Sequence, residues 1–311
     1  MIKTCVGCGA RLQNKDKSMI GYTPKENAKL CERCFKLKNY NQKEIIDLKY
    51  DNNDIINILN ENAEVVFFIT DFLSINKNVI DLFNQINKDK YLVINKIDYI
   101  PYSIKLEKYK DYLKKEYLVD EKIICLSALK KYNLNELNNR LLEHKNNYIC
   151  GFTNSGKSTI INAICKINNK ESNILESLMP NTTLDVIKIK LNDENYIFDT
   201  PGFITNYDFN INSFPKKYIK PITIQVKEND VIKFGDDKYI YCNKNNSFTF
   251  YMSPEIQVEK VYDCQNNLDN VVNLNENSDV IVDGYGFINI KNACVIKTNI
   301  NINEVRNSMF E

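Results

Sequence analysis

Residues 151–158 read G-F-T-N-S-G-K-S, which matches the pattern G-x-x-x-x-G-K-[ST] of a phosphate-binding loop. The apolar stretch 148–150 before it predicts a strand, and the apolar spacing over 157–166 predicts a helix. In such a loop, backbone N–H groups surround the phosphates at the helix N-terminus, where the helix dipole favours an anion. Lys157 would reach the β- and γ-phosphates, and Ser158 would offer its hydroxyl to Mg²⁺. The candidate nucleotide-binding residues here are Gly151, Asn154, Ser155, Gly156, Lys157, Ser158 and Thr159.

Short apolar segments alternate with amphipathic segments along the middle of the chain. We expect strands at 65–69, 91–94, 123–126, 148–150, 186–191 and 196–198. We expect helices at 76–88, 105–116, 134–145 and 157–166. This alternation predicts βαβ units, and therefore an α/β fold with a parallel sheet covered by helices on both faces.

A second, β-rich part follows this core. Strands are expected at 222–226, 239–242, 248–252 and 280–282, with few helix signals between them. Pro215 and Pro221 punctuate the chain, so we place a boundary near 208–218. The predicted domains are a cysteine module over 1–44, a nucleotide-binding domain over 45–210 and a β-rich domain over 215–311.

Composition and charge limit the classes of protein to which this chain can belong. The longest apolar runs, such as 65–69, are too short to cross a bilayer, and no apolar stretch precedes the first cysteines as a secretory signal would. We therefore expect a cytoplasmic protein without membrane attachment. The net charge of +1 hides a basic end, since residues 1–50 carry eleven Lys and Arg against five Asp and Glu. This end fits a contact with phosphates or a solvated face equally well.

The segment Asn95-Lys-Ile-Asp98 follows directly after the strand expected at 91–94. In a guanine site the Asp98 carboxylate accepts two hydrogen bonds from the base, and adenine lacks this pair of donors. The four-letter pattern alone is weak in a chain so rich in Asn and Lys. Its position strengthens it, because α/β sheets bind ligands at the carboxyl ends of their strands. The candidate guanine-binding residues are Asn95, Lys96 and Asp98, with Ser127 and Ala128 at the end of the next strand.

Another motif, Asp199-Thr-Pro-Gly202, ends the strand expected at 196–198. There Asp199 can hold the Mg²⁺ shell, and the Gly202 amide can contact the γ-phosphate. Four motifs at four strand ends predict a GTP site. Lys157, Mg²⁺ and the backbone amides would stabilise charge on the transferring phosphoryl group.

The order of these motifs is informative. N-K-I-D and Ser127-Ala128 precede the phosphate loop, and Thr182-Thr183 and D-T-P-G follow it, whereas in most P-loop GTPases the phosphate loop comes first. In this respect the chain resembles the circularly permuted GTPases. The permuted chain leaves its core just after D-T-P-G. The segment that senses the γ-phosphate therefore leads straight into the β-rich domain, which is a route for nucleotide state to move that domain.

Two cysteine pairs, Cys5-Val-Gly-Cys8 and Cys31-Glu-Arg-Cys34, are separated by twenty-two residues. Four thiolates satisfy tetrahedral Zn²⁺, and such a site can order a segment too small to build its own core. The competing interpretations are a redox C-x-x-C motif, which normally occurs once beside a βαβ unit, and unrelated core thiols. The predicted zinc ligands are Cys5, Cys8, Cys31 and Cys34.

A cysteine module, a permuted core and a β-rich C-terminal domain together resemble the YqeH-type GTPases of bacteria and organelles. The likeness is close at C-V-G-C-G-A-R-L-Q, G-F-T-N-S-G-K-S-T-I-I-N, T-T-L-D, D-T-P-G-F and I-K-P-I-T. The resemblance implies a GTP-hydrolysing factor in assembly of the small ribosomal subunit, with GTP, GDP and Mg²⁺ as ligands. It also implies that the cysteine module and the C-terminal domain contact ribosomal RNA or ribosomal proteins. We expect a monomer.

The resemblance also assigns roles to single residues. Thr183 is the expected Mg²⁺ ligand, with Thr182 as the alternative, although Asn181 stands where the family usually has glycine. Asn154 lies where GTPases with a hydrophobic residue after D-x-x-G carry an Asn that ligates K⁺; alternatively it only stabilises the loop turn. Phe203 replaces the Gln that orients water in many small GTPases, which implies slow intrinsic hydrolysis, or it is simply a core residue. The expected catalytic residues are Lys157, Thr183 and Gly202.

Two other functions fit the same sequence. One is a GTPase that acts in RNA modification or translation rather than in subunit assembly. The other is an RNA-binding scaffold that holds the nucleotide as a structural ligand and does not hydrolyse it. Turnover measured with and without small subunits separates the scaffold from both GTPase functions.

Overall fold

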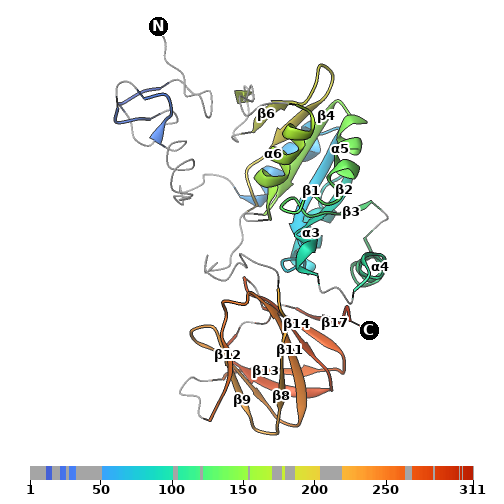
Figure 1. Ribbon diagram of the computed structural model, residues 1–311, viewed down its shortest axis with the longest axis vertical. Helices are drawn as coiled ribbons and strands as arrows, with labels where there is room; N and C mark the ends of the chain where they lie inside the picture. The colour runs from blue at the N-terminus through green and yellow to red at the C-terminus, as the bar shows by residue number, and fades with distance from the viewer. Residues whose placement is uncertain are drawn as a thin grey trace. The chain divides into compact units, whose positions relative to one another are not determined.

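The structure is a computed structural model. It describes residues 12–15, 22–25, 28–32, 51–100, 104–119, 122–152, 155–169, 177–178, 186–203, 219–262, 268–282, 284–300, 302 and 304–310. The chain divides into two compact units, whose elements are drawn in Figure 1. Unit 1 comprises Met1–Ile69, Gln85–Tyr91 and Asn133–Ile204, and unit 2 comprises Thr70–Asn84, Leu92–Tyr132 and Thr205–Glu311. The predicted domain limits at 44, 210 and 215 lie outside the described residues and stay predictions.

A seven-stranded sheet has the strand order β3-β2-β1-β4-β7-β6-β5. Its strands are β1 Val65–Asp71, β2 Asp89–Asn95, β3 Ile123–Cys125, β4 Asn146–Gly151, β5 Ser177–Leu178, β6 Ile187–Lys190 and β7 Tyr196–Asp199. The pairs β1–β4, β4–β7 and β2–β3 are parallel, which confirms the predicted α/β sheet. The pairs β6–β7 and β5–β6 are antiparallel, so the prediction of parallel strands is wrong at this edge. The short link between β6 and β7 permits a hairpin but not a crossover helix.

Every residue of β1 is buried, as expected for an apolar strand inside a covered sheet. The helices are α2 Asn52–Asn62, α3 Lys77–Asn84, α4 Leu106–Tyr117, α5 Leu134–Leu142 and α6 Lys157–Ile167, with a 3-10 turn η1 at Ile97–Tyr99. Helix α2 begins with a capping box, in which the side chains of Asp51 and Asp54 each accept the backbone N–H of the other. The helix predicted over 76–88 is too long: α3 ends at Asn84, because the chain must turn before β2 begins at Asp89.

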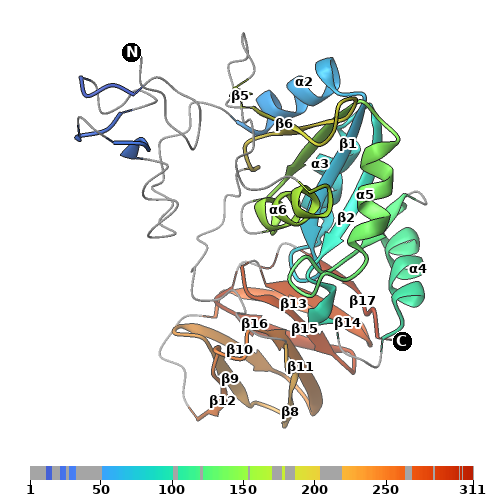
Figure 2. The same cartoon turned by 45° about the horizontal axis from the view of Figure 1, so that its top comes forward.

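The described residues from 219 onward form a sandwich of two five-stranded sheets, ordered β12-β9-β10-β16-β13 and β17-β14-β15-β11-β8 (Figure 2). Neighbouring strands are antiparallel throughout both sheets. The strands are β8 Ile222–Val226, β9 Val231–Phe234, β10 Lys238–Cys242, β11 Asn246–Met252, β12 Val258–Val261, β13 Asn270–Leu274, β14 Ser278–Val282, β15 Gly286–Ile290, β16 Cys294–Thr298 and β17 Val305–Asn307. The predicted β-rich character of this part of the chain is confirmed, and its described residues form more strands than the four segments predicted.

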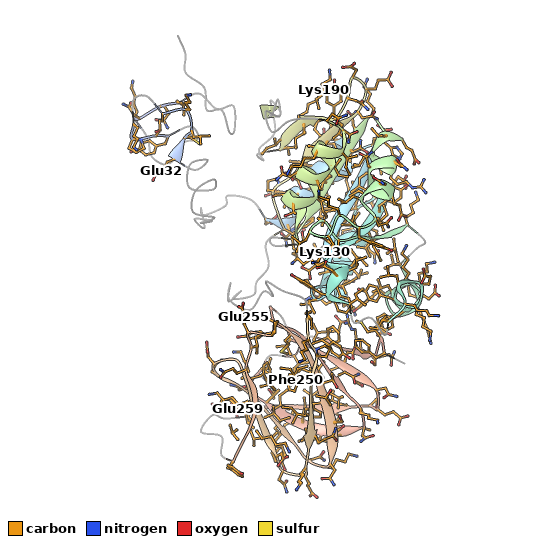
Figure 3. The ribbon with its side chains drawn as sticks, viewed as in Figure 1. Glu32, Lys130, Lys190, Phe250, Glu255 and Glu259 are labelled. Atoms are coloured by element: carbon orange, nitrogen blue, oxygen red, sulfur yellow. The ribbon has the colours of Figure 1, made fainter. Side chains whose placement is uncertain are left out.

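A single apolar core fills the space between the two sheets. Alternate residues of β11 supply it, and Phe250 on this strand is 1% exposed (Figure 3). The edge strand β12 instead carries exposed Glu259. At Gly286, where φ is 127°, an added Cβ would lie 2.2 Å from the carbonyl oxygen of Tyr251. Only glycine therefore lets β15 approach β11 this closely.

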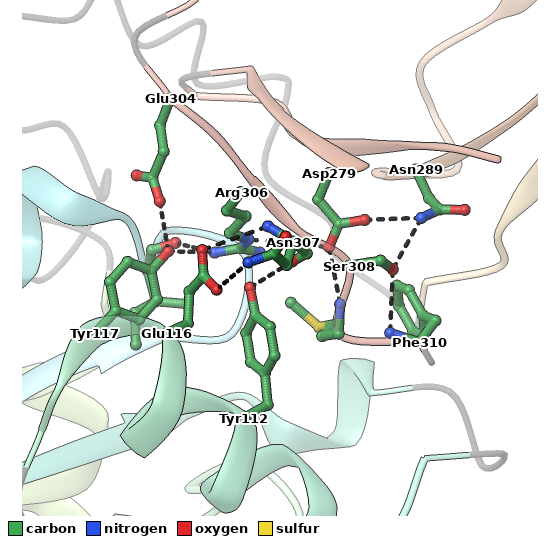
Figure 4. Close-up of polar contacts among 12 residues, drawn as sticks. Tyr112, Glu116, Tyr117, Asp279, Asn289, Glu304, Arg306, Asn307, Ser308 and Phe310 are labelled. Carbon is green, nitrogen blue, oxygen red and sulfur yellow. Dashed lines mark hydrogen bonds and ion pairs between the residues drawn. The ribbon is translucent and has the colours of Figure 1, made fainter. Parts of the chain in front are cut away.

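Within unit 2, strand β17 fastens the sandwich to α4 and to the turn before α3 (Figure 4). The key side chain is Arg306, which is 4% exposed. Its Nη1 donates to the carbonyl oxygen of Ile75 at 2.9 Å and to the Tyr117 hydroxyl at 2.8 Å. Its Nε lies 3.9 Å from Oδ2 of Asp279 on β14. Burial raises the pKa of the Asp279 carboxyl, and the Arg306 charge opposes this shift.

Further polar and aromatic contacts surround Arg306. The Asn307 side chain donates to Glu116 on α4 at 2.9 Å, and the Tyr112 hydroxyl donates to the Asn307 carbonyl oxygen at 2.8 Å. The ring of Phe72 meets those of Tyr109 and Phe287 edge to face, with centroids 5.4 and 5.9 Å apart. This junction therefore combines buried polar groups with an apolar core, and both stabilise unit 2.

Candidate nucleotide-binding site

The phosphate loop connects β4 to α6 in unit 1, as the sequence predicts. Gly151 ends β4 with φ 154°, and an added Cβ there would lie 2.3 Å from the carbonyl oxygen of Ile69 in β1. Gly156 has φ 90° at the N-cap of α6, a conformation that glycine adopts without strain. Ser158 and Thr159 are exposed on the first turn of the helix. The N-terminus of α6 thus presents backbone N–H groups and the hydroxyls of Ser158 and Thr159, which suits a phosphate group.

Lys157, the first residue of α6, and Asp199, the last residue of β7, come together. The Lys157 ammonium pairs with the Asp199 carboxylate and donates to the carbonyl oxygen of Thr200 at 2.6 Å. The two charged side chains are 13% and 18% exposed. Because β4 and β7 are parallel neighbours, their carboxyl ends place the two motifs side by side. The structure therefore brings together the residues predicted for phosphate and for the Mg²⁺ shell, while their roles stay predictions.

The residue after Gly202 belongs to the core. Phe203 is fully buried, and its ring packs on those of Phe68 and Phe152 with centroids 5.4 and 5.6 Å apart. Its N–H donates to the Gly151 carbonyl oxygen at 3.0 Å. Phe203 thus anchors D-T-P-G to the phosphate-loop strand, and it offers no polar side-chain atom to a water molecule.

The predicted guanine motif, N-K-I-D, lies in unit 2, where β2 ends at Asn95. The Asn95 side chain is 3% exposed, and its Oδ1 accepts the N–H of Ala128 at 3.1 Å. Asn95 therefore braces the Ser127-Ala128 segment, as two neighbouring strand ends permit. Asp98 stands in η1 and is partly exposed. Burial, followed by the charges of Asp98 and Asp71, raises the pKa of Tyr99 to about 12.

Asp71, the last residue of β1, was missed by the sequence analysis. It is 2% exposed, and its carboxylate lies 2.9 Å from the Lys96 ammonium of the guanine motif. The available signal was an acidic residue two positions after the apolar run 65–69, because buried carboxylates are rare unless they are paired. No motif marks the position, so the sequence alone did not connect it with Lys96.

Several predicted site residues lie outside the described residues, and their roles stay predictions. They are Cys5, Cys8, Cys34, Asn154, Thr182 and Thr183. Of the four predicted zinc ligands only Cys31 is described, and it is 2% exposed. Among the described residues, no three His, Cys, Asp or Glu side chains gather in a way that could hold a metal ion. Over the same residues, no helix is long and apolar enough to cross a membrane.

Comparison with known proteins identifies two matching families. The family described as RsgA GTPase matches residues 50–210, and the one described as 50S ribosome-binding GTPase matches residues 146–283. The YqeH protein of Bacillus subtilis is 35% identical, with coverage of 82% of this chain and 77% of the relative. The mitochondrial genetic interactor of prohibitins 3 from Vanderwaltozyma polyspora is 24% identical, with coverage of 67% and 50%.

Among solved structures, YjeQ from Thermotoga maritima matches with a TM-score of 0.33 and 24% identity, over 45% of this chain and 48% of that one. This TM-score is low, so the family assignment depends on the sequence matches. The RsgA match covers half of the chain and the YqeH match most of it. Both include the guanine motif ahead of the phosphate loop. The chain therefore belongs to the RsgA family of GTPases and is of the circularly permuted YqeH type.

Proposed function

We propose that this GTPase assists assembly of the small ribosomal subunit and acts as a cytoplasmic monomer. The observation that carries the proposal is the 35% identity to a YqeH protein over most of the chain, together with the permuted motif order. The second matching family is named for binding the 50S subunit, which supports a ribosomal partner and makes the choice of subunit a matter for experiment. The basic segment 1–50 and the β-sandwich are the proposed contacts with ribosomal RNA or proteins.

In the proposed site, N-K-I-D and Ser127-Ala128 would bind the base, and the phosphate loop and D-T-P-G would bind the phosphates and Mg²⁺. Asp98 would accept the guanine N1–H and amine, while Asn95 braces the segment that carries Ser127 and Ala128. Lys157 would exchange Asp199 for the β- and γ-phosphate oxygens, and so leave the Asp199 carboxylate to the Mg²⁺ shell. Bound Mg²⁺ supplies positive charge to the same oxygens. The residues proposed to hold it are Ser158, Thr183 and, through its shell, Asp199.

Hydrolysis would then follow from positioning and electrostatics. The Lys157 ammonium and the Gly202 amide would stabilise the negative charge that develops on the transferring phosphoryl group. Phe203 is buried and apolar, so it does not orient the attacking water. We expect slow hydrolysis by the isolated protein and faster hydrolysis with a ribosomal partner. Asn154 is the proposed K⁺ ligand, and the cysteine pairs of 1–44 are the proposed Zn²⁺ site.

Sedimentation with purified ribosomal particles tests the proposal. The protein is mixed with small or large subunits in the presence of a non-hydrolysable GTP analogue or GDP, and the particle fractions are assayed for it. We expect nucleotide-dependent association with the small subunit. Association with large subunits alone would contradict the assignment. GTP turnover that stays at zero with and without particles would favour the scaffold instead.

A further inference from the structure

The carboxylate of Asp71 has different partners for its two oxygens. Oδ1 accepts hydrogen bonds from the N–H groups of Leu73 and Ser74 and from the Ser74 hydroxyl, each at 3.0 Å. Oδ2 accepts the Lys96 ammonium at 2.9 Å. One oxygen therefore shapes the turn that follows β1, and the other holds the lysine of N-K-I-D.

Lys96 is a residue for which such a partner matters. Its backbone is left-handed, with φ 60°, and its side chain is 20% exposed. A lysine side chain has a flexible four-carbon stem, and holding it in one geometry costs conformational entropy. The Asp71 side chain is only 3% exposed, so water and salt screen this pair less than they screen a surface pair. Asp71 can therefore hold the ammonium in one place before any ligand arrives.

We propose that Asp71 is a positioning residue for guanine-nucleotide binding, which acts through Lys96 and does not touch the nucleotide. This inference rests on the proposed assignment of N-K-I-D to the guanine base. The Asn95 side chain has a separate tie, to Ala128. A change at Asp71 therefore displaces the Lys96 side chain and leaves the hydrogen bond between Asn95 and Ala128 in place. The competing role for Asp71 is purely structural, as the acceptor that closes the turn at Leu73 and Ser74.

The variant Asp71→Asn separates these roles. Its amide oxygen can still accept the turn hydrogen bonds, but its NH₂ group would face the Lys96 ammonium. We expect the Kd for GDP in the full-length protein, measured with a fluorescent analogue, to rise about tenfold, since bonds between charged groups are worth more than neutral ones. The melting temperature is expected to change little. Ser74→Ala is the matched control: it removes one turn hydrogen bond, leaves the Lys96 pair, and is expected to keep GDP affinity within about twofold.

A double-mutant cycle tests whether Asp71 acts through Lys96. In a Lys96→Met background, Asp71→Asn is expected to cause no further loss of GDP affinity. Asp71→Glu keeps the charge and is expected to bind GDP more tightly than Asp71→Asn. Three results would overturn the proposal. The first is a wild-type GDP affinity in Asp71→Asn, and the second is the same tenfold loss of GDP affinity in the Lys96→Met background. The third is that Asp71→Asn and Asp71→Glu bind GDP equally weakly.

A separate arm tests the guanine assignment on which the inference depends. Asp98→Asn is expected to lower the affinity for GTP and to raise the affinity for xanthosine triphosphate. If it leaves GTP affinity unchanged, the assignment of N-K-I-D fails and the role of Asp71 falls with it. If Asp98→Asn behaves as expected while Asp71→Asn binds like wild type, only the role of Asp71 is wrong.

Discussion

Replacing Arg306 by methionine should open the junction between the β-sandwich and α4. The substitution removes the two hydrogen bonds to Ile75 and Tyr117 and leaves Asp279, which is fully buried, without its counter-charge. Breaking a buried ion pair by removing one partner costs roughly 3–5 kcal/mol. The 3.9 Å separation of Arg306 Nε and Asp279 Oδ2 is long, so we take the lower end, about 3 kcal/mol.

Hydrogen exchange measured by mass spectrometry is a suitable assay, because the chain has no Trp for fluorescence and two units that need not unfold together. Peptides from β14 and β17 should lose about two orders of magnitude of protection in Arg306→Met, and strand β4 in unit 1 should lose little. Arg306→Lys keeps the charge and should cost about half as much in free energy. A loss below about fivefold in β17 would refute the view that Arg306 fastens the junction.

The free-energy cost of Arg306→Met should also depend on pH. Burial raises the pKa of Asp279 above its ordinary value of 3.8, so this group favours folding when protonated. That contribution is fully present below the unfolded pKa and is lost as the pH rises through the folded pKa. The positive charge of Arg306 lowers the pKa of Asp279 in the folded wild-type protein, so removing Arg306 raises this folded-state pKa further. The penalty of Arg306→Met should therefore be smaller at about pH 5 than at about pH 8, and a penalty independent of pH would contradict this account.

Three further predictions concern the nucleotide and the ribosome. Asp98→Asn should lower GTP affinity more than tenfold, since buried mispairing costs roughly 2–3 kcal/mol, and should raise affinity for xanthosine triphosphate; equilibrium titration with both nucleotides checks this. Deletion of residues 1–44 removes all four predicted zinc ligands and should leave GTP binding near normal while weakening ribosomal association and its salt dependence. Truncated protein that sediments with particles as well as the intact chain would show that this module is not the contact. Hydrolysis should be faster in K⁺ than in Na⁺ at equal ionic strength, and Asn154→Ala should abolish the difference while largely keeping binding; equal rates in the two salts would remove the cation from the mechanism.

The α/β core could be predicted from the sequence because its patterns are strong. The apolar run of β1 and the helix spacing of α6 each indicate one element type, and the phosphate loop places the N-terminus of α6 relative to a ligand. The antiparallel edge at β6 could be inferred only from the short link between β6 and β7. The prediction of βαβ units throughout the sheet did not allow for a hairpin there. Helix ends were less certain, as α3 shows, because tertiary context decides where a helix stops.

The sandwich and its attachment were harder to predict. Strands such as β12 and β13 are largely exposed at sheet edges, so their residues lack the alternation of a half-buried strand. Asp71 and Arg306 stand in no motif, and their roles depend on partners that are distant in sequence. Arg306 and Ile75 are 231 positions apart, and nothing local in either segment indicates that they meet.

That separation also bears on how the molecule reaches its native state. Unit 2 is assembled from three stretches of chain, and its closure must bring Ile75 and Arg306 together across a very long loop. Contacts so remote in sequence form slowly, because the loop entropy is lost before the contacts repay it. Until they form, Phe72, Tyr109 and Phe287 have no shared core and expose aromatic surface to the solvent. The stretch that carries N-K-I-D is therefore expected to mature late in folding and to expose aggregation-prone surface until it does.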